Sequence, residues 1–171
     1  KVFTKASAMP LDCGLRTGVK QGISPSRSPK SMVSFAAGMA SRGKKVFVYS
    51  IANFNTFRAL EQIRNDIGAM GLPVNLISIG SGFTYGNAGY SHHAIEDLGI
   101  LRGINGLELF SPADAIETKN VVKHIAKSAS PSYVRLSKNS NLRLHPDVDL
   151  NIQNPIRIAD GDSLAILFTG A

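Results

Sequence analysis

Two adjacent histidines follow a glycine-rich stretch, a pattern suited to hydrogen-bonding or acid–base chemistry. His92 and His93 close the segment that starts at Gly80, and we expect a helix to begin at Ser91 or His92. A helix N-terminus disfavours a cationic imidazole, so the pattern predicts a neutral ring that can both donate and accept hydrogen bonds. Their spacing does not indicate a metal site, and no cysteine is nearby. The alternative is a structural histidine.

Two phenylalanines form a second candidate group. Phe54 and Phe57 have helical spacing, which is typical of core residues, but they come just after a predicted strand, where aromatic rings can also stack on a ligand. Gly80-Ser81-Gly82 superficially resembles a dinucleotide-binding loop. The third glycine of the dinucleotide-binding motif G-x-G-x-x-G would stand at position 85, but here it is Gly86, and no helix begins directly after it. The sequence therefore argues against nicotinamide binding.

Alternating strands and helices must position these candidates. Apolar and β-branched runs predict strands, and three- and four-residue apolar spacing predicts helices. The expected strands are 45–50, 73–79, 107–110, 132–136 and 164–169, and the expected helices are 32–41 (capped by Ser31), 54–67, 91–101 and 111–128. This alternation predicts a three-layer α/β/α fold with a mainly parallel, doubly wound sheet. Ligands of such sheets bind outside the carboxyl ends of the strands, where the candidates lie.

Composition limits the class of protein. The chain has 171 residues, of which 43% are hydrophobic and 18% charged, as expected for one globular domain. One cysteine excludes an internal disulfide and favours a reducing, cytoplasmic location, and no apolar run approaches the roughly 20 residues of a membrane span. Residues 1–60 carry ten Lys and Arg against one acidic residue. These positive charges are scattered, which favours a solvated face or a phosphorylated small molecule over nucleic acid.

Several motifs together resemble one family. Met32–Ala40 is similar to the small-residue helix of the transketolase pyrimidine-binding domain, and Ile51–Arg58 to its aromatic segment. Gly86–Asp97 resembles the family's Gly-x-x-Gly-x-Thr-His-x-x-x-Glu-Asp loop, and Leu101–Thr118 its next strand and helix. The resemblance implies a thiamine-diphosphate enzyme that moves a two-carbon ketol unit between sugars.

The resemblance also implies roles for single residues. Phe54 and Phe57 would contact the cofactor's aminopyrimidine ring, with Ile51 in place of a further aromatic residue. His92 matches a histidine that hydrogen-bonds substrate oxygens and is the implied catalytic residue. Lys138 stands where many relatives place an arginine on the substrate phosphate, and a lysine keeps the charge without the bidentate fork.

Some positions depart from the family's pattern. Ala88 replaces an acidic residue and Gly80 a histidine of sugar-phosphate transketolases, which puts the usual substrate in doubt. The family's cofactor-activating glutamate falls on Pro29, or on Pro25 in a shifted alignment. No acidic residue lies between Asp12 and Glu61, so the chain is expected to bind the ring but to activate it weakly.

The resemblance divides the chain into three parts. Residues 1–31 are an atypical N-terminal segment, 32–139 the pyrimidine-binding domain, and 140–171 a linker with the truncated start of a third domain. In this family the cofactor's diphosphate and its Mg²⁺ or Ca²⁺ bind a different domain, so an N-terminal diphosphate-binding half and a homo- or hetero-oligomer are expected partners. The alternatives are deoxyxylulose-phosphate synthase, a 2-oxoacid dehydrogenase β subunit, and a non-catalytic subunit-association domain.

Overall fold

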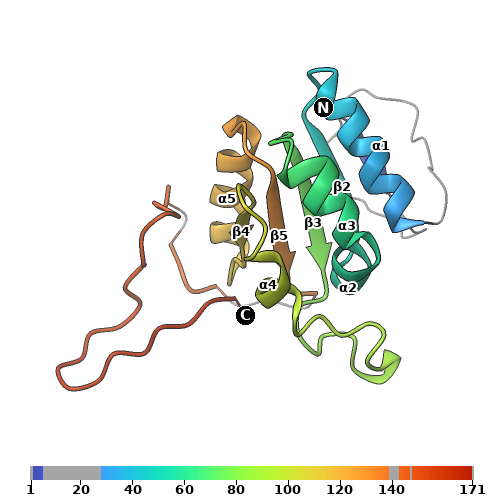
Figure 1. The fold of residues 1–171 in the computed structure, drawn as a ribbon. Helices are drawn as coiled ribbons and strands as arrows, with labels where there is room; N and C mark the ends of the chain where they lie inside the picture. Colours follow the sequence, from blue (N-terminus) through green and yellow to red (C-terminus); the bar gives the residue numbers. More distant parts are fainter. Residues whose placement is uncertain (1, 6–27, 139–142, 147, 171) are drawn as a thin grey trace.

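Five parallel strands form one sheet in the order β1-β2-β3-β5-β4 (Figure 1). The computed structural model describes residues 2–5, 28–138, 143–146 and 148–170. The strands are β1 (Val2–Lys5), β2 (Val46–Ile51), β3 (Val74–Ile79), β4 (Glu108–Phe110) and β5 (Ser132–Leu136). The prediction of a parallel sheet is confirmed.

Helices cover both faces of this sheet, which confirms the three-layer α/β/α class (Figure 1). They are α1 (Pro29–Ser41), α2 (Ala52–Thr56), α3 (Leu60–Gln62), α4 (Asp97–Leu101) and α5 (Ala115–Lys127). A 3₁₀ turn (Phe57–Ala59) joins α2 to α3, and a π-helical turn (Ile63–Gly68) follows α3. The predicted helix over 54–67 is therefore present, but it begins two residues earlier and is not a regular α-helix.

Two apolar clusters hold the layers together. Met32 and Ile63 pack with Val48, Leu76 and Tyr133 beneath α1 and the α3 turns. On the opposite face, α5 packs against the sheet through a smaller cluster of Phe47, Val121, Ile125 and Val134. Residues of one strand alternate between the clusters, as the period of a pleated strand requires. None of the helices in the described ranges combines the length and the apolar character needed to cross a membrane.

The first helix begins earlier than expected. It starts at Pro29 and is flanked by Ser28, which has an extended backbone, so Ser31 is not its cap. Proline suits the first helical turn because its missing N–H has no partner there in any case and its fixed φ already matches a helix. Pro25 and the rest of residues 6–27 lie outside the described residues. β1 was not expected within residues 1–31.

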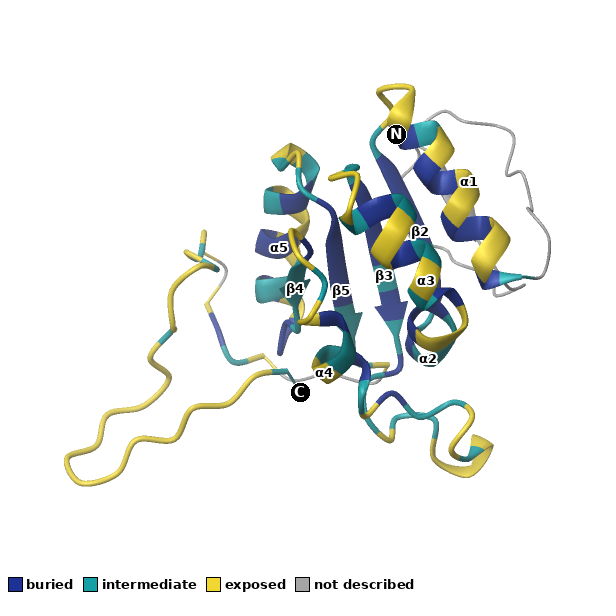
Figure 2. Cartoon of the chain, viewed as in Figure 1, coloured by how far each residue is buried: buried dark blue, intermediate teal, exposed yellow. Residues whose placement is uncertain are grey.

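In the described chain, one expected helix is shortened and one expected strand is absent. Residues 91–96 are loop, and only Asp97–Leu101 is helical, because Ala94 forms an antiparallel bridge with Gly82 that draws this stretch away from helical geometry. Residues 164–169 are not a strand: they are exposed, as Figure 2 shows, and no described segment pairs with them. An apolar run needs a neighbouring strand to satisfy its backbone before it becomes one.

Candidate functional site

The carboxyl ends of β2, β3 and β5 bring three chain segments together at one edge of the sheet. Residues 51–58 run from the last residue of β2 through α2 into the 3₁₀ turn, the long loop 80–96 follows β3, and residues 137–138 follow β5. These segments carry every residue predicted to bind cofactor or substrate. The topology therefore gathers residues that are up to 87 positions apart, from Ile51 to Lys138.

His92 lies between two aromatic rings. The centroid of its imidazole is 5.2 Å from that of Phe54 and 6.0 Å from that of Tyr85, with interplanar angles of 58° and 59°. Its Nδ1 lies 3.0 Å from the Ser91 hydroxyl oxygen. All three rings are partly exposed, so a ligand can reach them. His92 is in a loop rather than at a helix N-terminus, so the argument that a helix dipole keeps it neutral does not hold.

Lys138 reaches the same cluster through Tyr85. Its Nζ lies 5.2 Å from the centroid of the Tyr85 ring, within the range of a cation–π contact. The side chain of Lys138 is exposed and places a positive charge at the rim of the site. The structure thus brings together three of the predicted residues, namely Phe54, His92 and Lys138.

Phe57 and Ile51 lie at the margin of this cluster. Phe57 is in the 3₁₀ turn after α2 and is 39% exposed, whereas Ile51 is the last residue of β2 and pairs with Ile79 of β3. The guanidinium carbon of Arg58 lies 3.9 Å from the centroid of Phe54. One face of the Phe54 ring is therefore covered by a cation, and the exposed ring of Phe57 is more accessible to a flat ligand.

Hydrogen bonds from two neighbouring elements hold the histidine segment in place. The Asn53 side chain donates to the carbonyl of His93 at 2.8 Å, and the Arg135 guanidinium donates to the carbonyl of Ala94 at 2.7 Å. Gly82 and Ala94 exchange backbone hydrogen bonds of 2.8 and 3.0 Å. The loop is thereby fixed to α2, to β5 and to its own first residues.

A buried carboxylate supports this arrangement from below. Asp97 is fully buried; its Oδ2 accepts a hydrogen bond of 2.7 Å from the Tyr133 hydroxyl and lies 3.1 Å from Nε of Arg135. Burial, and then the charge of Asp97, raise the pKa of Tyr133 well above its usual range. The pair fixes Arg135, which in turn holds Ala94, two residues from His92.

Tyr85 is the member of the site that the sequence analysis missed. Its ring lies directly over Gly80, whose φ is +94° and whose added Cβ would fall 2.1 Å from Cε2 of Tyr85. A glycine directly after a strand, followed five residues later by an aromatic residue, is the signal that was available. It is too common a pattern to indicate a site by itself.

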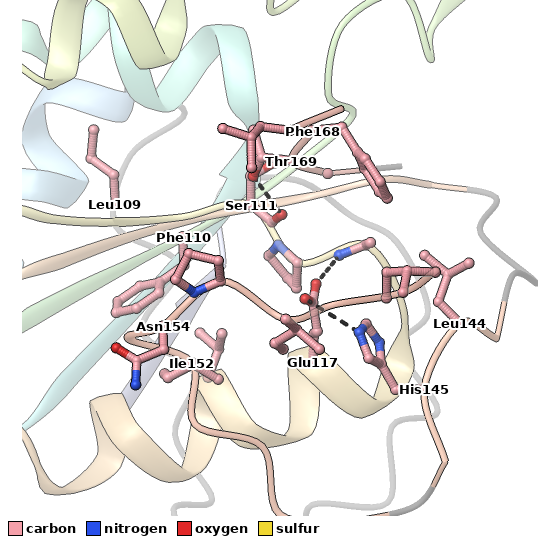
Figure 3. Close-up of a pocket in the computed structure, with 18 of the residues that line it drawn as sticks. Leu109, Phe110, Ser111, Glu117, Leu144, His145, Ile152, Asn154, Phe168 and Thr169 are labelled. Carbon is pink, nitrogen blue, oxygen red and sulfur yellow. Dashed lines mark hydrogen bonds and ion pairs between the residues drawn. The ribbon is translucent and has the colours of Figure 1, made fainter. Parts of the chain in front are cut away.

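A separate cavity of about 280 Å³ lies at the end of β4 (Figure 3). Its lining includes Phe110 and Ser111, residues near the start of α5, and parts of the C-terminal segment, including Phe168 and Thr169. None of the predicted site residues lines it. Within the described ranges, no group of three or more His, Cys, Asp or Glu side chains is placed to hold a metal ion.

Comparisons with known proteins agree with this geometry. Residues 29–143 match the family described as the transketolase, pyrimidine binding domain. The chain is 34% identical over 144 residues to a protein assigned as a transketolase C-terminal section in Methanocaldococcus jannaschii, covering 82% of this chain and 46% of that protein. It is 31% identical over 140 residues to one subunit of the apulose-4-phosphate transketolase of Phocaeicola vulgatus, covering 81% of this chain and 45% of that subunit.

A solved structure shows the same fold. It is described as a split gene transketolase, inactive beta4 tetramer, and it superposes with a TM-score of 0.62 at 33% identity, covering 69% of this chain and 37% of that one. The chain spans about half the length, or less, of the curated relatives and the solved structure it matches.

Proposed function

Because the chain belongs to the transketolase family through its pyrimidine-binding domain, we propose that it is the C-terminal half or subunit of a transketolase-like, thiamine-diphosphate-dependent transferase. The reaction moves a two-carbon ketol unit between sugar phosphates. The observation that carries this proposal is the convergence of Phe54, His92 and Lys138 at the carboxyl edge of the sheet. Each comes from a different chain segment, and the three supply an aromatic surface, a hydrogen-bonding ring and a cation.

The residues fit the aminopyrimidine part of the cofactor. Phe57 offers an exposed ring and Phe54 a partly buried one, and such rings orient a flat aromatic group by offset stacking worth about 1 kcal/mol beyond burial. Ile51 contributes an apolar contact at the end of β2. When bound, thiamine diphosphate supplies the carbanion chemistry that the side chains of proteins lack.

This chain's own contribution is then binding and orientation. His92 hydrogen-bonds substrate oxygens near the reacting carbon, and Lys138 binds the substrate's phosphate. By resemblance, the position of the family's glutamate falls on Pro29 or, in a shifted alignment, on Pro25. Pro29 is buried as the first residue of α1, and neither proline carries a carboxylate. We therefore expect ring binding from this chain, with weak proton transfer to or from the ring.

The rest of the active site is assigned to a partner. We propose that an N-terminal diphosphate-binding half holds the diphosphate and its Mg²⁺ or Ca²⁺, in a cytoplasmic homo- or hetero-oligomer. Residues 32–139 then act as the pyrimidine-binding domain, and residues 140–171 as a linker and the start of a further domain.

Cofactor affinity tests the proposal. Thiamine diphosphate is titrated calorimetrically, with Mg²⁺, into this chain, into a diphosphate-binding half from the same source, and into their equimolar mixture. We expect the mixture to bind at least about tenfold tighter than either chain alone, since stacking on Phe54 and Phe57 adds roughly 1–2 kcal/mol. Equal affinity of the mixture and of the isolated half would instead indicate a non-catalytic association domain.

A further inference from the structure

Tyr85 and Gly80 form a matched pair in the candidate site. A Cβ added to Gly80 would lie 2.1 Å from Cε2 and 2.6 Å from Cδ2 of Tyr85, so the ring occupies the space that any other residue at position 80 would need. The φ of +94° at Gly80 independently disfavours other residues there. The Tyr85 ring can therefore take this position only because residue 80 has no Cβ.

Tyr85 is also the shared neighbour of two residues with different predicted tasks. Lys138 Nζ lies 5.2 Å from its centroid, and the His92 ring lies 6.0 Å from it. A lysine side chain has a flexible four-carbon stem and loses much rotamer freedom when it binds an anion. A ring that already holds the ammonium group lowers this entropic cost, as preorganisation does in general.

We propose that Tyr85 is a specificity-determining residue of this site, whose ring fixes the distance between Lys138 at the anionic end of a phosphorylated sugar and His92 near its reacting carbon. This inference rests on the proposed function and names a residue to which neither the family resemblance nor the comparisons assign a role. The aromatic ring, and not the hydroxyl group, is the working part, because both contacts are made to the ring.

The chemistry of the neighbourhood agrees with this assignment. Burial raises the pKa of Tyr85, and burial together with the nearby Tyr85 raises the pKa of Tyr49 on β2, so both phenols stay neutral at physiological pH. Lys138 therefore has a neutral ring beside it and not a competing anion. Its charge remains available to a phosphate.

Steady-state kinetics of the chain assembled with its diphosphate-binding half test the proposal. The variants are Tyr85→Ala and Tyr85→Phe, each assayed with a ketose phosphate and with the same ketose without phosphate. We expect Tyr85→Ala to raise KM for the phosphorylated ketose roughly 5- to 10-fold with little change in kcat, because the contact that orders Lys138 is lost. KM for the unphosphorylated ketose should change much less. Tyr85→Phe should keep the wild-type preference for the phosphorylated ketose.

Phe83→Ala is the matched control. Phe83 is an aromatic residue of the same loop, but it is 69% exposed. Its ring packs against His93, with the two ring centroids 5.1 Å apart. Its loss should leave the preference for the phosphorylated ketose unchanged. An active Tyr85→Ala enzyme with the wild-type preference overturns the inference and leaves the proposed function intact.

An inactive wild-type assembly would count against the proposed function. In that case a second measurement tests the role of Tyr85 on its own. The His92 ring proton signals of the full chain alone are followed by NMR during titration with ribose 5-phosphate and with ribose. We expect ribose 5-phosphate to shift these signals in the wild type and in Tyr85→Phe, and ribose to shift them far less. Shifts that appear in Tyr85→Ala at the same ribose 5-phosphate concentration as in the wild type, or that are missing in the wild type, overturn the inference.

Discussion

The imidazole of His92 is oriented by two aromatic rings and a neighbouring hydroxyl group. Phe54 and Tyr85 flank the ring, and the Ser91 hydroxyl lies at Nδ1, so among the contacts of the described residues Nε2 is left to meet a ligand. The neighbouring His93 differs: its Nε2 contacts the carbonyl of Gly86 at 3.0 Å, within its own loop. The two histidines therefore differ in their contacts: His93 bonds the backbone of its own loop, whereas the proposed ligand contact of His92 uses Nε2.

Replacement of His92 by alanine should separate function from stability. We expect His92→Ala to lower kcat/KM of the assembled enzyme about 10²-fold, close to 2.7 kcal/mol, by removing hydrogen bonds to substrate oxygens. Cofactor affinity and melting temperature should stay near the wild-type values. His93→Ala is the control and should lower the melting temperature. Wild-type kcat/KM combined with a lower melting temperature in His92→Ala would assign it a structural role.

The contact between Gly80 and Tyr85 predicts a thermodynamic coupling. Gly80→Ala should destabilise the chain by at least 1–2 kcal/mol, since its left-handed backbone alone costs about that much for a residue with a Cβ and the ring must also move. In a Tyr85→Ala background only the backbone cost should remain. Urea unfolding of both single variants and the double variant measures the coupling. Additive effects would show that the ring does not press on Gly80.

At the scale of elements, the sequence predicts those strands whose bounds depend on the local pattern of apolar residues. β5 has the predicted bounds, and β2 and β3 begin one residue later than expected. A glycine-rich loop from Gly80 was predicted, but its continuation through residues 91–96 was not, because contacts distant in sequence hold that part: Arg135 donates to the carbonyl of Ala94, and Asn53 to that of His93. The family resemblance indicated Phe54, His92 and Lys138, but the part played by Tyr85 depends on a packing contact that only the structure shows.

The start of α5 is tied to the segment after β5 by one carboxylate. Asp114 accepts from the Glu117 backbone N–H at 2.8 Å through Oδ1, and from those of Leu144 and His145 at 2.9 and 3.0 Å through Oδ2. Burial opposes its ionisation, but these backbone hydrogen bonds outweigh that effect and hold the pKa of Asp114 well below its usual range. The carboxylate therefore joins α5 to the wall of the separate cavity.

The lowered pKa of Asp114 predicts that the free energy of unfolding falls in acid. A group whose pKa is lower in the folded than in the unfolded chain stabilises the fold above the unfolded pKa of about 3.9, and the stabilisation is lost as the pH falls through and below that value. Asp114→Asn should cost about 1–2 kcal/mol at pH 7 and flatten the fall in unfolding free energy between pH 5 and about 3. Urea unfolding across this range measures both. The control is Asp160→Asn, at an exposed ion pair with Arg157. An equally steep fall in Asp114→Asn would contradict the assignment.

At the scale of the whole molecule, the proposed function makes the described chain one part of a composite site. The aromatic, histidine and lysine residues lie at one open edge of the sheet, and the chain spans about half the length of its curated relatives. Phe57 is 39% exposed at this edge. A cofactor that contacts Phe54 and Phe57 with one end and a partner with the other would join the two chains, so cofactor binding and assembly should be thermodynamically linked.

This linkage is measurable by light scattering. We expect the chain to form a complex with a diphosphate-binding half, or with itself, and saturating thiamine diphosphate with Mg²⁺ to tighten the complex with the half roughly tenfold, from about 1.4 kcal/mol of ring stacking. Phe57→Ala should reduce this cofactor effect without weakening association in its absence, since the contact proposed for its ring is with the cofactor. His92→Ala should leave both association constants unchanged, because its proposed partner is the substrate. A strict monomer that ignores both the half and the cofactor would exclude the composite site.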